Sequence, residues 1–76
     1  MVVAGFLVKV EPGGARQVAN ELRALAGVEV HPAPESNNLA VVVEAEASEE
    51  LESLAIGRFA STHGVLGVYL TYVCLE

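Results

Sequence analysis

Apolar residues in this 76-residue chain cluster into strand-like runs and into two stretches with helical spacing. The first run, Val2–Val10 (VVAGFLVKV), is rich in β-branched and aromatic side chains and predicts a strand. After a Pro-Gly-Gly turn, the segment Ala15–Ala26 carries apolar side chains at Val18, Leu22 and Leu25. This spacing places them on one face of a helix.

The next segments predict a second and a third strand. Gly27 directly follows the first helix, where a left-handed C-cap favours glycine. Val28–His31 predicts a short strand, and Leu39–Glu46 (LAVVVEAE) predicts a third. Residues 32–38 between them (PAPESNN) are rich in turn formers and predict a loop.

A second helix and a long fourth strand complete the pattern. Ser48 is the expected N-cap of this helix, because acidic residues follow it in the first turn, where negative charge suits the helix dipole. The helix is expected to end at His63 and Gly64. Its buried stripe is expected to consist of Leu51, Leu54, Ala55 and Phe59. Val65–Leu75 predicts the last strand.

The resulting order, βαββαβ, predicts an α+β fold of the ferredoxin-like type. In this fold a four-stranded antiparallel sheet carries two helices on one face and leaves the other face open. No linker, repeat or low-complexity segment divides the chain, so residues 1–76 are expected to form a single domain.

Alternation along each strand predicts which residues occupy the open face. Lys9 is hard to bury in so small a core, so its side of the first strand is expected to face solvent. In LAVVVEAE, Ala40 and Val42 alternate in step with Glu44 and Glu46, so these two apolar residues are expected on the open side as well. The outward set comprises Val3, Gly5, Leu7 and Lys9, then Glu29 and His31, then Ala40, Val42, Glu44 and Glu46, then Gly67, Tyr69, Thr71 and Val73. The fourth strand is apolar on both sides, and its core side is assigned to Val68, Leu70 and Cys74.

Charge narrows the kind of partner that this face would bind. Ten acidic residues against four basic ones give a net charge of −6, which disfavours nucleic acid and favours a basic partner. The open face would nevertheless present an apolar field with glutamates along one border. Such a field is typical of an interaction site, although scattered exposed valines and sheet-to-sheet dimerisation are alternative interpretations.

The remaining composition bears on location. Cys74 is the single cysteine, so no intramolecular disulfide is possible, as is usual in a reducing compartment. No apolar run approaches the roughly 18 residues of a membrane span, and the N-terminus lacks the basic start of a signal peptide. The cytoplasm is therefore the expected location.

No motif indicates catalysis. Gly13 and Gly14 lack the lysine and the spacing of a phosphate-binding loop. Glu29 and His31 share a strand face, but two ligands without a third favour a solvated pair over a metal site. The sequence predicts neither an enzyme nor a bound cofactor.

Three segments carry a resemblance to a known family. LAGVEVHP at Leu25–Pro32, LAVVVEAEAS at Leu39–Ser48 and HGVLGVYLTYV at His63–Val73 resemble the NapD-type chaperones of periplasmic nitrate reductase. The resemblance implies a cytoplasmic maturation chaperone that binds the twin-arginine signal peptide of a molybdenum-enzyme precursor. It also implies that the peptide lies as a helix on the open sheet face, that export waits for cofactor insertion, and that the chaperone itself holds no cofactor.

The resemblance and the face assignment together give a set of expected peptide-binding residues. This set is Val3, Leu7, Lys9, Glu29, Ala40, Val42, Glu44, Glu46, Tyr69 and Thr71. The expected partner is the signal peptide of an exported redox-enzyme precursor, with no nucleic acid and no membrane insertion. A homodimer is also compatible with the apolar face.

A second resemblance supports an alternative function. KVEPGGARQVANELRALAGV, at residues 9–28, is similar to the opening of ACT domains and of the effector domains of leucine-responsive regulators. These are dimeric modules that sense small molecules, and the similarity implies amino-acid contacts around Pro12–Ala15. A third possibility is a purely structural oligomer. A tight dimer that gains thermal stability with amino acids would favour the sensing module.

Overall fold

The computed structural model describes residues 1–32 and 37–75 of the chain. The elements follow one another as β1 (Val2–Val10), α1 (Ala15–Arg23), β2 (Val28–Pro32), β3 (Asn38–Ala45), α2 (Ser48–Glu52), η1 (Ser53–Phe59) and β4 (Val65–Leu75). The four strands form one sheet in the order β2-β3-β1-β4, and all neighbours are antiparallel. The predicted ferredoxin-like α+β fold is confirmed.

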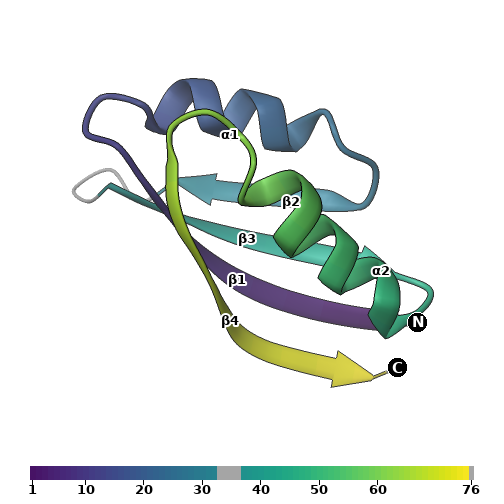
Figure 1. Ribbon diagram of the computed structural model, residues 1–76. Coiled ribbons are helices and arrows are strands. Elements are labelled where there is room, and N and C mark those ends of the chain that lie inside the picture. Colours follow the sequence, from purple (N-terminus) through teal and green to yellow (C-terminus); the bar gives the residue numbers. More distant parts are fainter. Residues whose placement is uncertain (33–36, 76) are drawn as a thin grey trace.

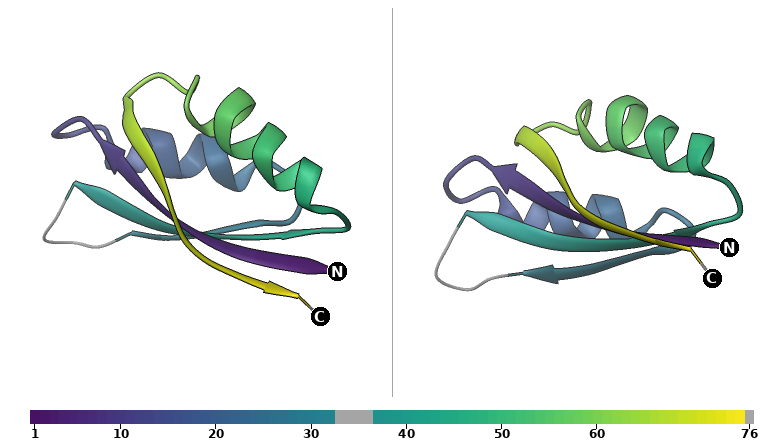
Figure 2. Two further views of the ribbon diagram at one scale, coloured as in Figure 1. Left: turned by 60° about the horizontal axis from the view of Figure 1, so that its bottom comes forward. Right: turned by 90° about the horizontal axis from the view of Figure 1, so that it is seen from below.

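Both helical segments lie on the same side of the sheet, as Figures 1 and 2 show. Strand alternation explains this arrangement, because every second side chain of β1 and β3 is buried under the helices. The core consists of Val2, Ala4, Phe6, Val8, Val10, Val18, Ala19, Leu22, Val30, Leu39, Val41, Val43, Ala45, Leu51 and Phe59. The other side of the sheet has no helical cover among the described residues.

The first helix is shorter than predicted. It ends at Arg23 with Ala24 as its C-cap, not at Ala26. Gly27 does have a positive φ, of 76°, but it lies beyond the cap, in the turn that leads into β2. There its carbonyl accepts a hydrogen bond of 2.9 Å from the Glu44 N–H, so this glycine joins the turn to β3 instead of capping the helix.

The second helical segment starts and ends differently from the prediction. Its N-cap is Ala47, and no side chain caps it, so the assignment of Ser48 as the cap is wrong. Instead, the Glu50 carboxylate accepts a hydrogen bond of 3.3 Å from the Glu46 N–H, which satisfies a donor just before the helix. The segment also ends at Phe59, before the turn that contains His63.

The second half of this segment, η1, is a π-helix. A π-helix is wider than an α-helix and frequently occurs at functional sites. Leu51 and Phe59 remain buried, whereas Leu54 and Ala55 of the predicted stripe are only partly covered. The Phe59 ring meets the Phe6 ring edge-on, with centroids 5.7 Å apart at 84°, and this contact joins η1 to the centre of the sheet.

A β-bulge changes the side-chain orientation along β4. Gly5 pairs with Tyr72 but Phe6 pairs with Leu70, so Thr71 has no partner residue on β1. Beyond the bulge the alternation is reversed relative to a regular strand. Val73, paired with the buried Ala4, lies on the helix side and not on the open face as predicted.

Cys74 shows the same reversal. It pairs with Val3 on the open side and is exposed, so its assignment to the core is wrong. Alternation along β4 could not reveal this shift, because residues of both faces of the strand are apolar.

The loop predicted over 32–38 falls partly on residues 33–36, which lie outside the described residues. Among the described residues, no helix is long and apolar enough to cross a membrane.

Candidate functional site

The strand register arranges the open face into four rows that run across the sheet. Directly paired residues share a face, so each row follows from the pairing. The rows are Asn38, Lys9 and Gly67; His31, Ala40, Leu7 and Tyr69; Glu29, Val42, Gly5 and Tyr72; and Glu44, Val3 and Cys74. Each of the two middle rows begins with a polar residue on β2, His31 or Glu29, continues through an apolar centre and ends with a tyrosine on β4.

The apolar centre forms the floor of the face. Leu7 is 36% exposed, Ala40 is exposed, and Val3 and Val42 are half-buried. A partner that covers these side chains removes their apolar surface from water, and this burial favours binding. We refer to Val3, Leu7, Ala40 and Val42 as the floor.

Two tyrosines of β4 lie across glycines on this face. A Cβ atom added to Gly5 would overlap Cε1 of Tyr72, so the Tyr72 ring occupies the space that a side chain at residue 5 would fill. A Cβ atom added to Gly67 would lie 2.8 Å from the Tyr69 hydroxyl oxygen. Both rings remain about half exposed, Tyr69 at 55% and Tyr72 at 49%. They form an aromatic border opposite the charged one.

The charged border lies on β2 and β3. Glu29 Oε2 and His31 Nε2 are 3.4 Å apart, and both side chains are well exposed. Glu44 is exposed in the last row, beside Val3. Lys9 lies at the opposite end of the face, so negative charge gathers along one side and one end.

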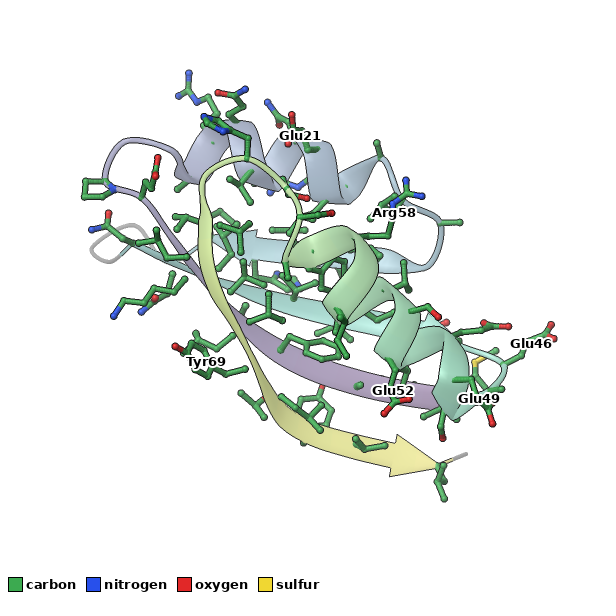
Figure 3. The ribbon with its side chains drawn as sticks, viewed as in Figure 1. Glu21, Glu46, Glu49, Glu52, Arg58 and Tyr69 are labelled. Atoms are coloured by element: carbon green, nitrogen blue, oxygen red, sulfur yellow. The ribbon has the colours of Figure 1, made fainter. Side chains whose placement is uncertain are left out.

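The structure places most of the predicted binding residues together on this face. Val3, Leu7, Lys9, Glu29, Ala40, Val42, Glu44 and Tyr69 occupy the four rows, and Thr71 lies beside them at the bulge, its hydroxyl 2.9 Å from the position of a Cβ atom on Gly5. Glu46 does not belong to these rows, because β3 ends at Ala45 and Glu46 lies in the connection to α2 (Figure 3). The sequence did not predict Tyr72 on the open face, because strict alternation from Tyr69 assigns Tyr72 to the core side.

The described residues contain no group of three or more histidine, cysteine or acidic side chains that could hold a metal ion. No buried side-chain polar atom lacks a hydrogen-bond partner in the described part of the chain. The groups that the face offers are mainly apolar side chains, two tyrosine rings and carboxylates.

Replacement of Gly5 by alanine tests the position of Tyr72. The added methyl group would overlap the ring, so the ring must swing away, at an expected cost of about 1–3 kcal/mol of unfolding free energy. Chemical denaturation measures the cost, and the aromatic NMR signals of Tyr72 report the movement. Gly57→Ala is the matched control, because a Cβ atom there meets nothing within 4 Å. Unchanged Tyr72 signals in Gly5→Ala would contradict this placement.

Fold and face together define a small ferredoxin-like domain with an open, apolar and acid-bordered sheet surface. The family model described as NapD protein matches residues 1–76 of the chain. The chain therefore belongs to the NapD family, and the predicted family is confirmed. A search of curated proteins found no match.

Solved structures agree with this assignment. The Tat proofreading chaperone protein NapD of E. coli is 35% identical, with a TM-score of 0.82, and the match covers 97% of this chain and 78% of that chain. A hypothetical protein of Pyrococcus horikoshii, PHS023, matches with a TM-score of 0.87 at 19% identity over 100% of this chain and 92% of its own. TTHA0845 of Thermus thermophilus has the same TM-score and identity, over 100% of this chain and 95% of its own. The last two show the fold alone.

Family membership also bears on the class of activity. The NapD family is a family of chaperones and not of enzymes, which confirms the prediction that the chain is not an enzyme.

Proposed function

We propose that this protein is a cytoplasmic proofreading chaperone that binds the twin-arginine signal peptide of a molybdenum-enzyme precursor on its open sheet face. The precursor of a periplasmic nitrate reductase is the proposed client, and bound peptide delays export until the cofactor is inserted. The observation that carries the proposal is the apolar floor with a glutamate border, in a member of a family whose E. coli protein is a Tat proofreading chaperone.

The chemistry of the face complements such a peptide. A twin-arginine leader has a basic front followed by an apolar middle, and an apolar helix would cover the floor while its arginines approach Glu29 and Glu44. Apolar burial supplies most of the affinity, at roughly 25 cal/mol per Å² before the cost of ordering the peptide. Each exposed ion pair adds only about 0.2–1 kcal/mol. The glutamates therefore select the partner and speed its arrival more than they hold it.

The direct test is a titration of the protein with synthetic twin-arginine leaders, followed by amide NMR. Saturable binding is expected to shift the amides of Leu7, Val42, Glu44 and Tyr69. A protein that ignores every leader, sediments as a dimer and gains thermal stability with free amino acids would overturn the proposal in favour of a small-molecule-sensing module.

Charge reversal at the acidic border tests the electrostatic part. In Glu29→Lys/Glu44→Lys, the association rate with a leader is expected to fall by roughly tenfold at low salt, because steering by the border is lost. The salt dependence of the rate should also flatten. Stopped-flow fluorescence measures both. Glu21→Lys/Glu52→Lys is the matched control with the same change in net charge, since Glu21 lies on α1 and Glu52 on α2, both on the helical side of the sheet (Figure 3). An equal effect of this control would assign steering to net charge and not to this border.

A further inference from the structure

The two edges of the sheet differ in how well they are protected from pairing with another strand. β2, at one edge, is short, carries Glu29 and His31, and ends at Pro32. Charges, short length, proline and β-bulges are the usual means of blocking an edge. β4, at the other edge, is 11 residues long, and its sequence VLGVYLTYVCL contains neither charge nor proline.

Bulges divide the free edge of β4 into short regular segments. Register shifts fall between Gly5 and Phe6 and between Lys9 and Val10 of β1. The segment Tyr72–Leu75 remains regularly paired with β1 on its inner side. Its outer side has no strand beside it among residues 1–32 and 37–75. This edge therefore suits a short extended segment better than a long strand.

A groove on the helix side follows this edge. It lies between β4 and the α2–η1 helix and has a volume of about 570 Å³. Phe6, Leu51, Val68, Leu70 and Val73 line it with apolar side chains, and Ile56 of the π-helix stands at its rim. Leu70, Val73 and Ile56 are 58%, 50% and 74% exposed, so the groove is open to side chains from outside. It is on the opposite side of β4 from the floor.

Acidic side chains mark one end of the groove. Glu49 and Glu52 of α2 both line it, and both are exposed. Strand pairing shows where they lie along β4. Ala45, just before α2, pairs with Val2 of β1, and Val2 pairs on its other side with Leu75 at the end of β4. The first turn of α2 therefore lies toward the C-terminal end of β4, as Figure 3 shows for both labelled glutamates.

We propose that this groove and the free edge of β4 form a second docking site, which binds an extended apolar segment of a partner protein with basic residues ahead of the apolar ones. The segment adds to β4 as an antiparallel strand, so its N-terminal lysines or arginines lie near Glu49 and Glu52. Alternate apolar side chains enter the groove beside Leu70 and Val73. A second copy of this chain is disfavoured, because it would bring its own Glu49 and Glu52 and a charge of −6.

A pair of synthetic peptides tests the proposal with the full chain. The probe is acetyl-Lys-Lys-Thr-Val-Thr-Leu-Thr-Gly-amide, and the control has the same residues in reverse order. In ¹⁵N NMR titrations, the probe is expected to shift the amides of Leu70 and Tyr72–Leu75 saturably, with NOEs between peptide and β4 backbones. Shifts confined to the floor, no saturation at millimolar probe, or equal binding of the reversed peptide would overturn the proposal.

Neighbouring residues on opposite faces of β4 provide a matched pair of variants. Leu70→Asp is expected to weaken probe binding by at least about tenfold, because it places a charge in the groove. Tyr69→Asp, of similar exposure but on the open face, should change it by less than about twofold and weaken only leader binding. The two sites are thus tested separately, and failure of one leaves the other intact.

Charge and self-association give the last two readouts. Glu49→Lys/Glu52→Lys is expected to weaken probe binding by roughly 3- to 10-fold at low salt, and high salt should remove the difference. Sedimentation should show that the free protein does not dimerise through this edge. A dimer that Leu70→Asp dissociates would assign the groove to a second copy and overturn the proposal.

Discussion

Leu7→Asp is expected to weaken binding of a twin-arginine leader by about 100-fold or more, and to leave the fold intact. Leu7 lies at the centre of the floor, between Ala40 and Tyr69, where a bound helix would cover it. Loss of a buried leucine costs about 1.5–3 kcal/mol, which is roughly 10- to 150-fold in affinity. An unpaired carboxylate under an apolar helix adds a desolvation penalty to this loss.

Isothermal titration calorimetry measures this effect, and circular dichroism checks the fold. Because Leu7 is already 36% exposed in the free protein, the substitution is not expected to disturb the core. Ile56→Asp is the control, since Ile56 is 74% exposed on η1, away from the floor. A loss smaller than about threefold in Leu7→Asp, or an equal loss in Ile56→Asp, would show that the leader does not bind on the floor.

Strand alternation accounts for how much of this surface could be predicted. In β1 and β3 one side is almost wholly apolar and the other contains Lys9 or Glu44, so a single charged residue fixes the side of its neighbours. The floor follows directly from that pattern. The order of the elements and the position of the helices follow from the same rule, because only one side of these strands can form the core.

The same rule fails where it has no polar residue to act on. Every residue from Val65 to Leu75 is apolar, aromatic, glycine or threonine, so a one-residue bulge changes no position from polar to apolar. Alternation along β4 therefore could not reveal the reversal beyond Thr71 or the outward position of Tyr72. Gly5 held an indirect signal, since a glycine within a strand often marks a close approach by another group.

The second helix shows a different limit. Apolar spacing located the buried Leu51 and Phe59, but it also included Leu54 and Ala55, which are only partly covered. Both lie in the π-helix, whose wider turn the spacing of apolar residues does not reveal. Ile56 of this π-helix is 74% exposed and is one of the residues that line the groove beside β4. The start of α2 is a further case: Ser48 is a residue type expected at an N-cap, yet the N-cap is Ala47 and no side chain caps it.

Phe59→Ala is expected to destabilise the protein by about 3–5 kcal/mol, the usual cost of removing a buried phenylalanine. Phe59 is completely buried and meets Phe6 edge-on, so its removal leaves a cavity between η1 and the sheet. Globular domains are stable by only about 5–15 kcal/mol, and a chain of this size belongs near the lower end. The variant is thus expected to melt at least about 12 °C lower and to be partly unfolded at 37 °C.

Thermal and urea denaturation followed by circular dichroism measure the loss. Phe59→Leu retains most of the side-chain volume but loses the aromatic contact with Phe6, and it should lower the unfolding free energy by at most about 1.5 kcal/mol. The difference between the two variants then measures the effect of the cavity. Ile56→Ala, three residues earlier on the exposed side of the same segment, should stay within about 0.5 kcal/mol of the unmodified protein. If Phe59→Ala cost no more than Ile56→Ala, η1 would not be anchored to the sheet through Phe59. The groove beside β4 would then lack the fixed wall that docking requires, whereas the floor, built from β1 and β3, would keep its shape.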